Sequence, residues 1–190
     1  MAADVVVADA EADGPSADVG DTSAGGSCAT YCALVQKKCF GDNSEYISNE
    51  VCLNMCKLMT PGAVGAVSGD TVACRAHYAQ ETAGDLKQIC RQAGPTGGTV
   101  CGPSRCDIWC NFAATNCKGV ADAPFTDLDG CKKVCDAAVY DPTLRDLDGK
   151  GGTLNCLIYQ LENTFQTTDG VSTAGHCMHL TTASGPCKAP

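Results

Sequence analysis

Apolar and cysteine residues recur at helical spacing along most of the chain beyond residue 27. The clearest run follows Ser27 and consists of Cys28, Tyr31, Cys32, Val35 and Cys39. These positions stand at i, i+3, i+4, i+7 and i+11, which places them on one face of an α-helix. Serine is a favoured N-cap, so a helix is predicted to begin directly after Ser27. The same spacing returns in Cys106, Trp109, Cys110, Ala113 and Cys117 and predicts a second helix of this kind.

Two further helices are predicted in each half of the chain by the same criterion. A helix after Ser48 carries one apolar face, Cys52, Met55, Cys56 and Met59, and its later counterpart carries Cys131, Val134, Cys135 and Ala138. A third helix is expected from Thr71 through Cys74 and Tyr78, and its counterpart starts at Thr153 with Leu154, Cys156, Ile158, Leu161 and Phe165. Beyond each third helix the chain is rich in Gly, Ser, Thr and Pro, which predicts a looped tail.

The sixteen cysteines form two successive sets of eight with nearly the same spacing. The first set is Cys28, Cys32, Cys39, Cys52, Cys56, Cys74, Cys90 and Cys101, and the second is Cys106, Cys110, Cys117, Cys131, Cys135, Cys156, Cys177 and Cys187. Such self-similarity predicts a tandem duplication. The expected fold is mainly α, with two small disulfide-rich helical modules that each contain about three short helices and a looped C-terminal tail.

The spacing also divides the chain into four predicted parts. They are an acidic N-terminal arm (1–27), repeat 1 (28–101), a linker (102–105) and repeat 2 (106–190). Within the arm, the run from Ala3 to Ala10 contains three valines in succession, so it could pair as a strand with a neighbouring subunit.

All sixteen cysteines are predicted to form disulfides. No C-x-x-C occurs in the chain, whereas zinc knuckles and iron–sulfur loops usually need such short turns. The density of cysteine predicts an oxidising compartment, so we expect a secreted, cell-surface or periplasmic protein. Two antiparallel helices that each carry C-x3-C favour the pairs Cys28–Cys56, Cys32–Cys52, Cys106–Cys135 and Cys110–Cys131. A shifted register that uses Cys39 or Cys117 is the alternative.

The charge of the chain is concentrated in the arm. Its first 27 residues carry six acidic residues and no Lys or Arg, which accounts for -6 of the net charge of -9. The body offers no basic patch for nucleic acid or for an anionic membrane surface. No apolar stretch is long enough to span a bilayer, and the amino terminus lacks the pattern of a signal peptide. Because disulfides require export, we expect that a leader was removed.

Three histidines are the candidate ligands for a metal or a haem iron: His77, His176 and His179. His176 and His179 stand at i, i+3 and could face one ion if that segment is helical. The haem-attachment sequence C-x-x-C-H is absent. A calcium turn from Asp146 fails because Lys150 occupies a ligand position. No hydrolase motif of the G-x-S-x-G or H-E-x-x-H type occurs, so no catalytic residues are predicted.

Parts of the chain resemble a known group of proteins. The residues that carry the likeness are the run from Cys28 to Cys39, the pair Cys52 and Cys56, the segment from Cys74 to Tyr78, and Ala93-Gly94-Pro95 leading to Cys101-Gly102. They resemble the mostly uncharacterised cysteine-rich modules of exported, often lipid-anchored, myxobacterial-type proteins. In that pattern a Tyr-His pair follows the sixth cysteine and histidines flank the seventh. Each repeat of this chain keeps only part of that arrangement.

The leading hypothesis is a non-enzymatic extracellular structural or interaction protein, which could be a subunit of a surface assembly or filament. Its partner would be another protein or a further copy of itself, and the Ser/Thr/Pro-containing tails offer positions for O-linked glycan. No cofactor is expected on this hypothesis. The alternative is a haem- or copper-binding electron-transfer module that uses the three histidines. A secreted hydrolase or inhibitor is a third class.

Overall fold

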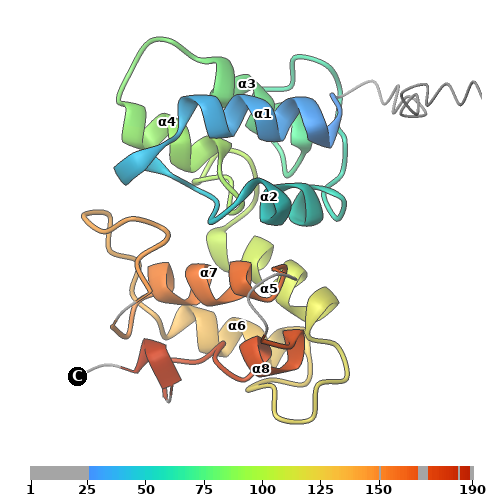
Figure 1. Ribbon diagram of the computed structural model, residues 1–190, viewed down its shortest axis with the longest axis vertical. Helices are drawn as coiled ribbons and strands as arrows, with labels where there is room; N and C mark the ends of the chain where they lie inside the picture. Colours follow the sequence, from blue (N-terminus) through green and yellow to red (C-terminus); the bar gives the residue numbers. More distant parts are fainter. Residues whose placement is uncertain (1–25, 150, 167–170, 184, 189–190) are drawn as a thin grey trace, which may run out of the picture.

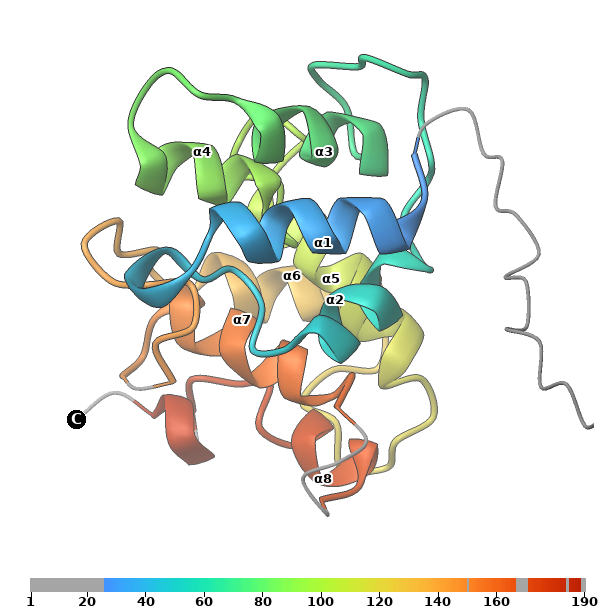
Figure 2. The same ribbon diagram turned by 45° about the horizontal axis from the view of Figure 1, so that its top comes forward.

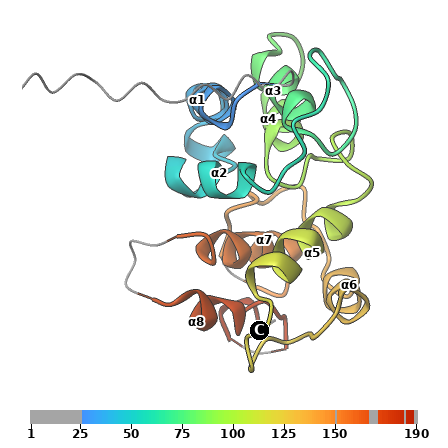
Figure 3. The ribbon, with the colours of Figure 1, turned by 90° about the vertical axis from the view of Figure 1, so that its right-hand side faces the viewer.

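The computed structural model describes residues 26–149, 151–166, 171–183 and 185–188, and their fold is mainly α-helical (Figure 1). The N-terminal half (residues 26–101) contains α1 (Cys28–Lys38), η1 (Gly41–Asn43), α2 (Asn49–Cys56), α3 (Val72–Gln80) and α4 (Leu86–Ala93). The C-terminal half (residues 105–188) contains α5 (Arg105–Asn116), α6 (Leu128–Asp136), α7 (Leu154–Asn163), α8 (Thr173–Cys177) and η2 (Gly185–Cys187). The two halves are stacked along the long axis, with α2 next to the C-terminal half (Figures 1 and 3).

The predicted helix starts are confirmed by side-chain caps. Ser27 and Ser48 cap α1 and α2, and their hydroxyl oxygens accept hydrogen bonds from the backbone N–H groups three residues later. Thr71 and Thr153 do the same for α3 and α7. These hydroxyls satisfy N–H groups that have no partner within the helix, which explains why the helices begin there.

Every cysteine belongs to the described residues, and all sixteen form disulfides. The four pairs favoured from the sequence are confirmed: Cys28–Cys56, Cys32–Cys52, Cys106–Cys135 and Cys110–Cys131. The shifted register is wrong, because Cys39 pairs with Cys90 and Cys117 with Cys177. The last pairs are Cys74–Cys101 and Cys156–Cys187. In both sets the first cysteine pairs with the fifth, the second with the fourth, the third with the seventh and the sixth with the eighth.

Each half contains one helix more than the sequence predicted. Helix α4 carries the seventh cysteine of the first set, Cys90, and the short helix α8 carries the corresponding Cys177. The sequence of α4 has the apolar spacing of an amphipathic helix, since Leu86, Ile89, Cys90 and Ala93 stand at i, i+3, i+4 and i+7. Asp85 caps it by accepting a hydrogen bond from the backbone N–H of Lys87. The looped tails begin only after these helices.

The core combines cystines with a few large side chains. Trp109 is completely buried, and its indole N–H donates a 3.0 Å hydrogen bond to the carbonyl of Leu157. In the N-terminal half the corresponding Tyr31 is also buried, and its hydroxyl donates to the carbonyl of Ala93 at 2.6 Å. Both aromatic groups therefore bury their ring and satisfy their polar atom within one half.

A buried arginine has no counterpart in the second set. Arg75 follows the sixth cysteine and is completely buried, whereas Leu157 follows the sixth cysteine of the second set. The guanidinium of Arg75 donates to four acceptors. They are the carbonyls of Thr71, Gly94 and Pro95 and the carboxylate of Asp70. Arg75 thus ties α3 to the chain that follows α4.

Within the described ranges, none of the helices has the length and apolar character needed to cross a membrane. The predicted acidic arm lies outside the described residues except for its last two, and so does its valine run. The division of the chain into two modules stays a prediction.

Candidate functional site

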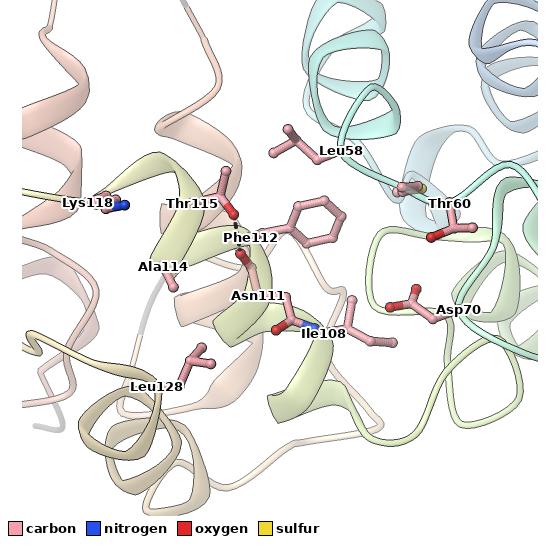
Figure 4. Close-up of a pocket in the computed structure, with 11 residues that line it drawn as sticks. Leu58, Thr60, Asp70, Ile108, Asn111, Phe112, Ala114, Thr115, Lys118 and Leu128 are labelled. Atoms are coloured by element: carbon pink, nitrogen blue, oxygen red, sulfur yellow. Dashed lines mark hydrogen bonds between the residues drawn. The ribbon is translucent and has the colours of Figure 1, made fainter.

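A groove of about 580 Å³ lies between the two halves (Figure 4). The N-terminal half contributes the chain after α2 and the residue before the cap of α3. The C-terminal half contributes α5 and the first residue of α6. The lining residues are Leu58, Met59, Thr60, Asp70, Ile108, Asn111, Phe112, Ala114, Thr115, Lys118 and Leu128. We call this site the inter-half groove.

The groove face of α5 is distinct from its cystine face. Ile108, Asn111, Phe112 and Thr115 stand at i, i+3, i+4 and i+7, so they form a second stripe on the helix. Ile108 and Phe112 form the buried floor, with 1% and 6% of their surface exposed. The opposite stripe of α5 is joined to α6 by two disulfides. The covalent bonds therefore fix the direction in which the groove stripe points.

Gly102 allows Ile108 to reach its place in the floor. The backbone of Gly102 has φ +152°, and a Cβ atom built there would lie 2.1 Å from Cδ1 of Ile108. A side chain at this position would strain the backbone and force the end of the Ile108 side chain to shift. The link between the halves and the shape of the groove thus depend on the same glycine.

Charged and half-exposed apolar side chains mark the ends and the rim of the groove. Asp70 and Lys118 lie at opposite ends (Figure 4). Asp70 is fixed by Arg75, since an Arg75 Nη2 atom lies 2.7 Å from its Oδ1. Leu58 and Leu128 are 47% and 49% exposed. The accessible apolar surface of the groove is therefore provided mainly by Leu58 and Leu128 at its rim, with one charge of each sign at its ends.

Polar contacts between the halves hold the groove in shape. Glu162 of α7 accepts a 2.8 Å hydrogen bond from the backbone N–H of Ile47. Asn54 of α2 donates to the carbonyl of Phe165 at 3.1 Å. Arg91 of α4 donates to the carbonyls of Pro142 and Leu144 at 2.7 and 2.9 Å. The relative position of the halves is therefore set by side chains that reach from one half to backbone groups of the other.

The three candidate histidines do not come together. His77 lies in α3, and its Nε2 is 3.7 Å from Oε1 of Glu81. His176 is buried in α8, and His179 follows it and is partly buried. Helices α3 and α8 lie at opposite ends of the molecule (Figures 1 and 2). In the described part of the chain, no group of three or more His, Cys, Asp and Glu side chains is arranged to hold a metal ion.

Sequence reasoning missed both the groove and a set of buried acidic residues. The second stripe of α5 was a readable signal for the groove, because Ile108 and Phe112 are apolar and lie off the cysteine face. Glu45, Asp146 and Glu162 are 4%, 1% and 0% exposed, and nothing local in the sequence distinguishes them from surface acids. Asp146, considered above for a calcium turn, accepts a hydrogen bond from the hydroxyl of Tyr140 instead.

Comparison with protein families gives a match that covers just under half of the chain. Residues 12–104 match the family described as the BfoA family C-terminal domain. The matched range contains the complete first set of eight cysteines, and the second set lies outside it. No curated protein and no solved structure matches the chain. The match and the eight disulfides fit a cysteine-rich domain, while the myxobacterial and lipid-anchored character suggested by the resemblance stays a prediction.

Proposed function

We propose that this chain is a non-enzymatic extracellular interaction protein, built by duplication of one disulfide-bonded helical module, that assembles with further copies of itself at a cell surface. Many disulfides fit an oxidising extracellular or periplasmic environment. Eight cysteines allow many pairings, so the shared pairing order of the two sets supports duplication.

The inter-half groove is the observation that carries the proposal. Its floor is apolar and its rim carries two half-exposed leucines, which is the composition of a protein interaction site. Two disulfides hold α5 against α6. Asn54 of α2 is hydrogen-bonded to the carbonyl of Phe165, whose ring packs against Phe112 of α5. A groove on elements this rigid binds a partner with little loss of conformational entropy in the protein itself.

The occupant that we propose is the arm of a second copy. Residues 5–8 of the arm are Val-Val-Val-Ala, with Asp4 before and Asp9 after them. In extended form, four residues span about 13 Å. One of the two aspartates would find an opposite charge in Lys118, and the other would lie towards Asp70, whose charge Arg75 neutralises. If each copy donates its arm to the groove of the next copy, the molecules form an open chain, because head-to-tail contacts that do not close into a ring continue indefinitely.

Substitution of Leu128 by Glu is expected to weaken self-association of the full chain. We predict that the wild type forms larger species as its concentration rises, and that Leu128→Glu raises the dissociation constant at least about tenfold, which corresponds to ~1.4 kcal/mol. The loss arises because docking of the apolar arm would remove the new carboxylate at the rim from water. Val6→Glu in the arm is expected to have the same effect. Sedimentation velocity over a concentration series measures the change.

Val139→Glu is the matched control, because Val139 is 73% exposed and does not line the groove. It should leave the association unchanged. A wild type that stays monomeric at every concentration contradicts assembly through the arm. Equal effects of Leu128→Glu and Val139→Glu contradict the groove as the docking site.

The proposed role includes no cofactor and no catalytic step. The alternative of a haem or copper site at the histidines predicts a visible absorption band or bound metal in the purified protein. An absorption spectrum and elemental analysis of the native, untagged protein distinguish the two functions. We expect neither a Soret band nor stoichiometric copper.

A further inference from the structure

Three buried carboxyl groups from separate segments gather where the two halves meet. Glu45 belongs to the N-terminal half and follows η1, while Asp146 and Glu162 belong to the C-terminal half. All three are at least 96% buried. They interact electrostatically with one another, since Asp146 and Glu162 both act on Glu45. We call Glu45, Asp146 and Glu162 the interface carboxyls.

Each interface carboxyl has one oxygen without a hydrogen-bond partner in the described part of the chain. These atoms are Oε2 of Glu45, Oδ2 of Asp146 and Oε1 of Glu162. An ionised carboxylate in such a place would lose its hydration without replacement, which is costly. A protonated carboxyl group avoids most of that cost.

Two arginines lie near the interface carboxyls, and the buried Nε of one of them, Arg105, has no hydrogen-bond partner in the described part of the chain. Arg105 stacks on the ring of Tyr140, with its Cζ 3.9 Å from the ring centroid. Arg91 donates its hydrogen bonds to two carbonyls, and its Nε is 3.7 Å from Oδ1 of Asp146. Neither arginine forms an ion pair with Glu45 or Glu162 in the structure. Asp146 is thus the one interface carboxyl that forms an ion pair with an arginine, while Arg91 and Arg105 act on Glu45 from a greater distance.

We propose that the junction of the two halves is a proton-dependent latch, which holds while Glu45 and Glu162 are protonated and loosens when both ionise. Glu162 is central to it, because Oε2 of Glu162 accepts the N–H of Ile47 across the junction. Two additional buried negative charges beside Asp146 would repel one another and attract water into the junction. The latch would couple the geometry of the inter-half groove to the pH of the surroundings.

The groups around the interface carboxyls support raised pKa values for Glu45 and Glu162. Burial raises the pKa of Glu45 well above its usual value, and the charges of Asp146 and Glu162 raise it further, against Arg91 and Arg105. Burial also raises the pKa of Glu162, which the hydrogen bond from Ile47 only partly offsets. The pKa of Asp146 is raised by burial and lowered by Tyr140, Arg91, Arg105 and Lys87.

The neighbouring tyrosines do not titrate in the same range. Burial raises the pKa values of Tyr31, Tyr46 and Tyr140 above that of a free tyrosine, so all three stay protonated when the carboxyls titrate. Among the tyrosines and carboxyl groups of the junction, only the carboxyl groups therefore change charge between acidic and neutral pH.

The sign of the pH dependence follows from proton uptake. Above the ordinary pKa of a glutamate, near 4.3, the folded state holds protons on Glu45 and Glu162 that the unfolded state has released. The free energy of unfolding then falls as the pH rises through the folded pKa values. These two groups stabilise the fold at mildly acidic pH and lose that effect towards neutral and alkaline pH.

Thermal unfolding of the full chain at several pH values tests the latch. We expect the melting temperature to fall by about 5 °C or more between pH 5 and pH 8, because each kcal/mol corresponds to roughly 2–4 °C at this size. The double variant Glu45→Gln and Glu162→Gln should show no such fall, since an amide cannot ionise. Each single variant should show about half of it. Asp122→Asn is the matched control, because Asp122 is exposed and far from the interface carboxyls in sequence, and it should retain the wild-type profile.

Hydrogen exchange of the Ile47 amide gives a second readout that needs no variant. After correction for intrinsic exchange rates, its protection should decrease from pH 5 to pH 8 more than that of amides within α1 or α5. A wild-type melting temperature that is constant or rises over this range overturns the latch. Constant protection of Ile47, or an unchanged slope in the double variant, overturns it as well.

Discussion

Complete reduction of the eight disulfides is expected to unfold the chain at 25 °C. The chain has only ten aromatic residues among 190, and 14 of the 35 buried apolar positions in the described part of the chain are cysteines. Its longest disulfide loops close 51 and 60 residues, and a disulfide of this kind contributes about 4 kcal/mol by restricting the unfolded chain. A typical domain is stable by only ~5–15 kcal/mol in total, so loss of all eight disulfides removes more free energy than the fold has in reserve.

Near-ultraviolet circular dichroism around Trp109 measures this outcome. The reduced chain, unfolded in denaturant and returned to native buffer with reductant, should lack the signal of a buried tryptophan. The control is the oxidised chain taken through the same steps, which should regain its signal. A reduced chain that recovers the native spectrum would show that packing alone specifies the fold.

Substitution of Arg75 by Met is expected to destabilise the chain by about 3–5 kcal/mol. Methionine has a similar length, but it donates no hydrogen bonds. The carbonyls of Gly94 and Pro95 then lose a buried donor, and Asp70 loses its partner at the end of the groove. Each buried acceptor without a partner costs ~1–3 kcal/mol. Guanidinium chloride denaturation, followed by the fluorescence of Trp109, measures the loss.

Leu157→Met is the matched control, because Leu157 occupies the equivalent position after the sixth cysteine of the second set. A volume-conserving change in an apolar site should cost less than about 1.5 kcal/mol. If Arg75→Met costs no more than Leu157→Met, the hydrogen bonds of Arg75 do not contribute to stability as described. Arg75→Lys should recover little, since one ammonium group cannot serve four acceptors in different directions.

Local patterns predicted the elements of this fold that depend on neighbouring residues. The capping serines and threonines, the faces of α1, α2, α3, α5, α6 and α7, and the pairing of the C-x3-C cysteines all follow from helical geometry. The pairing of Cys39 with Cys90 did not, because their separation of 51 residues leaves the partner to tertiary packing. Helix α4 was missed because its residues were assigned to the looped tail.

The candidate sites were less predictable for a similar reason. Ile108 and Phe112 could be recognised as apolar, but only the packing of α5 beside the chain after α2 turns them into a groove floor. Glu45 and Glu162 are separated by more than one hundred residues, and their burial arises from the junction of the halves. The histidines were candidate ligands because of their residue type alone. The structure places α3, which carries His77, far from α8, which carries His176 (Figure 1).

The most direct test of the account is whether the arm occupies the inter-half groove. An isotope-labelled full chain carrying Val6→Glu, whose own arm cannot compete, is titrated with an unlabelled peptide of residues 1–12. We predict saturable shifts of amide signals at Leu58, Ile108, Asn111, Thr115 and Leu128, with none at Val139. The absence of shifts, or shifts confined to residues outside the groove, would contradict the account.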